Sequence, residues 1–108
     1  MNSNDNYLSV ENLVEKLQAP GQVVRVYAAT LLGSLGEAAA ETIPALVHML
    51  ETGDVPERRV AVLALRELGP VAHEAIPALL VAAKDQDELV AEMAAQALER
   101  LRHQRKAA

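Results

Sequence analysis

The sequence predicts an all-α solenoid in which about three pairs of helices stack in a row, and three observations lead to that expectation. The segment Ile-Pro-Ala-Leu at residues 43–46 returns 33 residues later at 76–79. Residues 24–51 and 57–84, aligned at the same offset, are identical at 11 of 28 positions. Ala, Leu and Val supply 48 of the 108 residues, and there is no Phe, Trp or Cys. A repeat of this length, built from small aliphatic residues, indicates one helical unit stacked on itself.

The first class of helix is marked by apolar residues at positions i, i+3, i+4 and i+7, which share one face of an α-helix. Residues 10–17 follow this spacing, and it returns at 43–50 and 76–83. Pro44 and Pro77 fall in first turns, where the missing backbone donor should kink or restart the helix. Helices of this class are expected at 7–18, 38–51 and 71–84.

The second class of helix lies between these, with apolar stripes at residues 27–35, 60–68 and 93–101. The first two stripes close on a leucine that is followed by Gly36 or Gly69, where a helix end favours a positive φ. Helices of this class are expected at 23–35, 56–68 and 87–103, which gives six helices in all.

The stripes predict one hydrophobic core and simple domain boundaries. We expect a flexible N-terminus at 1–6, a single repeat domain at 7–103 and a basic C-terminal tail at 104–108. The side chains expected to be buried in the core include Leu46, Leu50, Leu65, Leu68 and Leu79.

The charge distribution disfavours nucleic acids as partners. The net charge is −5, and the basic residues gather at Arg100, Arg102, Arg105 and Lys106. Binding a phosphate backbone needs clustered cations, whereas bases near a helix C-terminus complement its dipole. No apolar run is long enough to cross a membrane, and the N-terminus is polar rather than signal-like. These features predict a cytoplasmic protein that contacts no membrane.

The repeat resembles a known family. Val24-Arg25, Ala28-Ala29, Leu32, Leu35-Gly36 and Ile43–Leu46 are similar to the short bacterial HEAT-like repeat, also called the phycobilisome-lyase-like repeat. The resemblance covers nearly the whole chain. It implies a right-handed α-solenoid with a concave, protein-binding face. The second helix of each repeat unit lines that face, which in this chain means the helices expected at 7–18, 38–51 and 71–84.

The resemblance leaves three functional classes open. The first is a non-catalytic module that binds a protein or peptide on the concave face. The second is an accessory or chaperone-like subunit of an enzyme such as a bilin lyase. The third is a nucleic-acid binder similar to the HEAT-like alkylpurine glycosylases, but these have a basic, aromatic-bearing concave face that this chain lacks. We favour the first class.

An arginine and an aspartate recur together in the repeat. Arg25 precedes Asp54 by 29 residues, and Arg58 precedes Asp87 by the same 29. In a stack this spacing predicts a structural ladder in which each arginine pairs with the turn into the next unit, and the aspartates cap helices. The alternative is a row of arginines that binds an anion.

Residues typical of catalysis or metal binding are scattered in the sequence. His48, His73 and His103 lack a second histidine at the spacing that a metal site on helices needs. The pair His73-Glu74 resembles the His-Glu pairs of deoxyhypusine hydroxylase, but a single pair cannot complete a di-iron site. No nucleophile with a His–acid arrangement is present. We therefore expect no catalytic residues, no metal and no cofactor.

The solvent side of the 10–17, 43–50 and 76–83 helices is the candidate binding face. It is mixed and mildly acidic, which suits a partner with a basic and apolar surface. The alternative is an ordinary solvated face. The candidate binding residues are Asn12, Glu15, Glu41, His48, Thr52, Glu74, Val81 and Asp85.

The last helix suggests a second, weaker contact. Each repeat unit begins with a helix of the 23–35 kind, so the last helix begins a unit whose other helix is missing. We expect the missing helix to leave Met93, Ala94, Ala97 and Leu101 partly bare. This strip predicts a weak edge contact, with another copy of the chain as one candidate.

Overall fold

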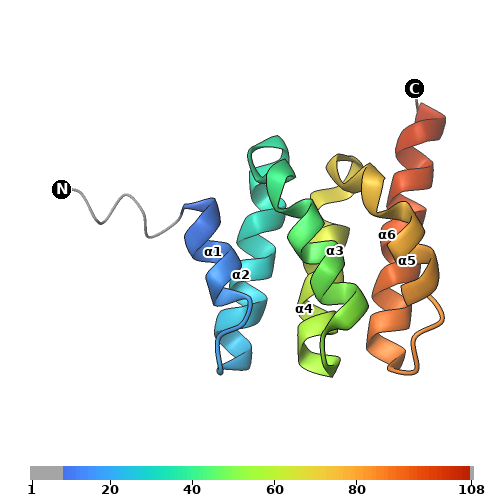
Figure 1. Ribbon diagram of the computed structural model, residues 1–108. Coiled ribbons are helices and arrows are strands. Elements are labelled where there is room, and N and C mark those ends of the chain that lie inside the picture. Colours follow the sequence, from blue (N-terminus) through green and yellow to red (C-terminus); the bar gives the residue numbers. More distant parts are fainter. Residues whose placement is uncertain (1–8, 108) are drawn as a thin grey trace.

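The computed structural model describes residues 9–107, with side chains placed for residues 9–102, and every regular element in that part is helical (Figure 1). The predicted all-α solenoid is confirmed. Residues 1–8, which include the whole of the expected flexible N-terminus, lie outside the described part. The α-helices are α1 (Val10–Lys16), α2 (Gln22–Leu35), α3 (Ile43–Thr52), α4 (Val55–Leu68), α5 (Ile76–Ala82) and α6 (Glu88–Ala107), and the 3₁₀ helices are η2 (Gly36–Thr42) and η3 (Gly69–Ala75).

The two prolines restart their helices as the sequence predicts. Each expected helix divides into a 3₁₀ segment, η2 or η3, and an α-helix that begins one residue before Pro44 or Pro77. Proline is tolerated there because the first-turn N–H groups have no partner inside the helix. Gly36 and Gly69 end α2 and α4 with φ values of 55° and 62°, which side chains rarely allow. α6 continues through residues 104–107, assigned to a tail from the sequence, because no Gly or Pro stops it.

The helices form two layers. α2, α4 and α6 pack side by side in one layer, and α1, α3 and α5 cover them in the other. α2 and α4 make the closest contact, because Gly33 of α2 lies directly against Glu67 of α4. α3 and α5 contact each other at only a few positions. The two layers therefore differ in how tightly neighbouring repeats approach.

One hydrophobic core runs between the layers. All five leucines expected in the core are buried. The core is otherwise rich in alanine, and these small side chains allow the helices to approach closely. The large side chains that are almost fully buried are Leu17, Leu32, Ile43, Leu46, Leu65, Leu79, Val62 and Val90.

Candidate functional site

The surface formed by α3, α5 and the 3₁₀ helices η2 and η3 carries five of the eight residues that the sequence predicts to bind a partner. His48 on α3 and Val81 on α5 occupy equivalent repeat positions and are exposed, Val81 to 74%. Glu41 in η2 and Glu74 in η3 are also equivalent and exposed. We call this surface the α3–α5 face and define it by the exposed side chains of Glu41, His48, Thr52, Glu74, Leu80 and Val81.

A groove of about 460 Å³ lies between α3 and α5. It lies where these two helices contact each other at only a few positions, and Val81 is the exposed apolar side chain of its lining. A concave surface is the usual form of a binding site, and the lining of this one is mixed rather than mostly apolar. The groove is lined by Leu50, Ala78, Val81 and Ala82, by Glu51, Gly53, Lys84 and Gln86, and by Arg58 and Asp85.

Two predicted binding residues belong to a different place. Asn12 and Glu15 lie on α1, where they line a separate shallow hollow together with Ser9 and Glu11. The backbone N–H of Asn12 donates to Ser9 Oγ at 3.1 Å, which caps the start of α1. These residues do not line the groove between α3 and α5.

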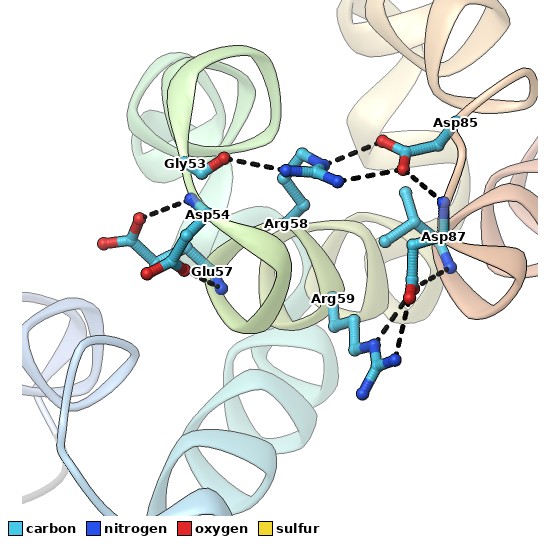
Figure 2. A network of polar contacts seen from close by, with 8 residues as sticks. Gly53, Asp54, Glu57, Arg58, Arg59, Asp85 and Asp87 are labelled. Atoms are coloured by element: carbon cyan, nitrogen blue, oxygen red, sulfur yellow. Dashed lines mark hydrogen bonds and ion pairs between the residues drawn. The ribbon is translucent and has the colours of Figure 1, made fainter.

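Asp85 is a structural side chain of the groove wall. Arg58 Nε and Nη2 donate to its two carboxylate oxygens at 2.8 and 3.0 Å, and Nη1 donates to the Gly53 carbonyl at 3.0 Å (Figure 2). The hydrogen bond from Arg58 lowers the pKa of Asp85 below its ordinary value. Both of its carboxylate oxygens are engaged within the chain, and its part in partner binding stays a prediction.

The partner of Arg58 is a correction. The sequence paired Arg58 with Asp87, but Asp87 accepts from Arg59 Nε and Nη2 at 3.0 and 2.8 Å. Asp87 also accepts from the Val90 N–H at 3.1 Å, so it caps α6 as predicted. The hydrogen bond from Arg59 lowers the pKa of Asp87 to about 2. Two adjacent arginines on α4 thus hold two aspartates of one turn, and the turn itself is the one that the sequence predicts.

The first rung of the ladder does not form. Arg25 Nη1 donates to the carbonyls of Ala19 and Pro20 at 2.7 and 3.0 Å, and it makes no ion pair with Asp54. The Asp54 carboxylate instead accepts from the Glu57 N–H, and the Asp54 N–H donates to Glu57 Oε1. The repeat position equivalent to Asp85 is occupied here by Thr52, so Arg25 has no carboxylate to meet. One contact does recur in both repeats: Arg25 and Arg58 each donate from Nη1 to the backbone carbonyl five residues earlier in the chain.

Removing Arg58 and Asp85 singly and together should reveal their interaction. We expect the Arg58→Ala and Asp85→Ala changes in unfolding free energy to couple by about 1 kcal/mol in urea titrations at neutral pH. Because the folded-state pKa of Asp85 is lowered, this coupling is present above the ordinary value of 3.8 and is lost as the pH falls below it. The Arg58→Ala and Asp87→Ala pair is the matched control and should couple less. Additive effects of Arg58→Ala and Asp85→Ala would contradict the structural role.

The last helix is not bare where the sequence predicts. Met93, Ala94, Ala97 and Leu101 are all buried, because α4 and α5 already cover that side of α6. The exposed side of α6 carries other residues, which include Ala95. An edge contact through the buried strip is therefore excluded.

The histidines of the described part of the chain lie far apart in the sequence and on different elements. His48 and His73 are exposed on separate elements, and the His103 side chain lies outside the described residues. Among the described residues, no three His, Asp or Glu side chains gather closely enough to hold a metal ion. Within the same residues no helix is both long and apolar enough to span a membrane.

The geometry defines an α-solenoid of repeated helix pairs with a groove between two of its helices. The family model for HEAT repeats matches residues 10–99. The chain therefore belongs to the HEAT-repeat proteins. No curated protein matches it significantly.

Proposed function

We propose that this HEAT-repeat chain is a non-catalytic module that binds a protein or peptide on the α3–α5 face. The observation that carries the proposal is the groove between α3 and α5, which is lined in part by the exposed side chain of Val81. A concave surface with an exposed apolar side chain in its wall is typical of an interaction site. The 33-residue period favours the short, phycobilisome-lyase-like type of HEAT repeat.

The charges of the face favour a basic and apolar partner. Glu41, Glu51 and Glu74 are exposed on or next to the α3–α5 face, and the bases that line the groove are Lys84 and Arg58, which is paired with Asp85. Apolar side chains of a partner would fill the groove, while its lysines or arginines would lie close to the glutamates. Such complementarity raises the association rate and selects the partner more than it raises affinity.

Two lysines placed on the α3–α5 face should weaken the binding of a partner. His48→Lys with Val81→Lys adds two positive charges at exposed positions. Val81 is the one of the two that lines the groove. We expect a partner selected from a displayed peptide library to lose at least about tenfold in affinity, which is about 1.4 kcal/mol. The melting temperature should stay nearly unchanged, because both side chains are exposed. The measurement is titration calorimetry of the selected peptide against the folded variant.

The matched control places the same charges on the opposite layer. Val23→Lys with Thr30→Lys changes two exposed residues of α2 and leaves the α3–α5 face intact. This variant should bind the peptide as the wild-type chain does. If the control loses affinity and the His48 and Val81 variant does not, the binding face lies on the α2, α4 and α6 layer and the proposal is wrong.

A further inference from the structure

One side of α2 exposes residues whose repeat equivalents are buried. Tyr27 is 59% exposed, whereas Val60 and Met93, which stand one and two repeats later, are 3% and 6% exposed. Val60 and Met93 are covered because α4 and α6 each pack on the helix before them. We call this side of α2 the upstream edge and define it by Val24, Tyr27, Leu31 and Leu35.

The far end of the same edge repeats the contrast. Leu35 is 37% exposed, but the equivalent Leu68 and Leu101 are 4% and 3% exposed. The upstream edge is therefore a helix-packing surface of the kind that holds the repeats together, and in the described part of the chain no helix of the same layer covers it.

The opposite end of the stack shows the complementary pattern on α6. Ala29 and Val62 are fully buried against the next helix of their layer, whereas the equivalent Ala95 is exposed. We call this side of α6 the downstream edge and define it by Ala91, Ala95 and Leu98. α2 and α6 lie at opposite ends of the molecule (Figure 1), so the two edges face in opposite directions along the stack.

The two internal joints share one register. Glu67 of α4 lies against Gly33 of α2, and Arg100 of α6 donates from Nη1 to the Arg66 carbonyl of α4 at 2.7 Å. Each contact joins residues that are 34 apart. If the register continues into another copy, the small side chain of Ser34 comes opposite Glu99 of the preceding copy. Tyr27 and Leu31 then come opposite Glu92 and Gln96, which follow Ala91 and Ala95 of the downstream edge.

We propose that a second copy of this chain stacks head to tail, with its upstream edge on the downstream edge of the first. The occupant is argued from continuity, because the chain already joins such edges twice in this register. The proposal is independent of the α3–α5 face. The contact is heterologous, so it does not close at two copies and assemblies should grow with concentration. It involves little more than one helix on each side, so we expect weak, reversible association at roughly 0.1–1 mM.

Two edge-blocked variants of the 108-residue chain test the proposal. Tyr27→Lys blocks the upstream edge and Ala95→Lys blocks the downstream edge, and both positions are exposed enough to accept lysine without loss of the fold. Sedimentation velocity should show the wild-type chain growing beyond a dimer as its concentration rises to about 1 mM. Each variant alone should be monomeric, with association weakened at least about tenfold. An equal mixture should form dimers only, because it retains one intact pair of edges.

Three results would overturn the proposal. One is a wild-type chain that stays monomeric up to about 1 mM, which includes the case in which residues 1–8 cover the upstream edge. Another is an Ala95→Lys variant that still dimerises while Tyr27→Lys does not, because this indicates a symmetric contact between two upstream edges. The third is self-association that neither substitution weakens.

Discussion

Replacing Leu65 with alanine should lower the free energy of unfolding by about 2–5 kcal/mol, measured by urea denaturation. Leu65 is 1% exposed and lies on α4, the helix with neighbours on the most sides. The truncation removes apolar atoms from contact with the core and leaves a cavity that packed helices fill only in part. A chain of this size has little stability to lose, so the variant should be largely unfolded at physiological temperature.

A second leucine provides the matched control. Leu80→Ala makes the same chemical change on α5, where the side chain is 56% exposed. We expect this variant to stay within about 0.5 kcal/mol of the wild-type chain, because surface positions tolerate substitution. If Leu65→Ala costs no more than Leu80→Ala, the core is not centred on α4 as the structure has it.

The helices and the core could be predicted because their signals repeat. The 33-residue offset placed Leu65 and Leu68 under Leu32 and Leu35, and the glycines after each stripe marked the helix ends. The sequence did not predict the 3₁₀ segments η2 and η3, because a proline in a first turn is compatible with either a kink or a restart of the helix. Packing of each 3₁₀ segment on the core decides the outcome, with Ala39 and Ala72 buried at equivalent positions.

The groove wall was harder to predict because its ion pair does not repeat. The spacing of 29 residues occurs twice between arginine and aspartate, yet neither pair forms in the structure. The pair that does form, Arg58 with Asp85, has Arg25 and Thr52 at the equivalent positions one repeat earlier. A second arginine beside the first gave Asp87 a different partner, Arg59. Repetition is therefore a good guide to the core and a poor one to the turns.

Replacing Gly33 with alanine should destabilise the chain by about 1–3 kcal/mol, even though alanine is the better helix former by about 1 kcal/mol. A Cβ at Gly33 would overlap Glu67 Cβ and come within 3.1 Å of the Glu67 backbone. The overlapping atoms are not the far end of a flexible side chain, so rotation cannot relieve the contact. α2 and α4 must move apart, and their shared core loses contact. Urea denaturation measures the loss, with the free energy of unfolding and its slope against urea concentration fitted for each variant.

A compensating change at Glu67 separates this steric effect from any other. Glu67→Gly alone should cost about 1 kcal/mol through helix propensity. It also removes the Cβ that a side chain at Gly33 would meet, so Gly33→Ala should cost much less in that background than in the wild-type chain. A cost of Gly33→Ala that falls strongly in the Glu67→Gly background requires that the two residues be in contact. If Gly33→Ala stabilises the wild-type chain, helix propensity outweighs the contact and α2 and α4 are not as close as the structure has them. Equal costs in the two backgrounds would place the clash at another residue.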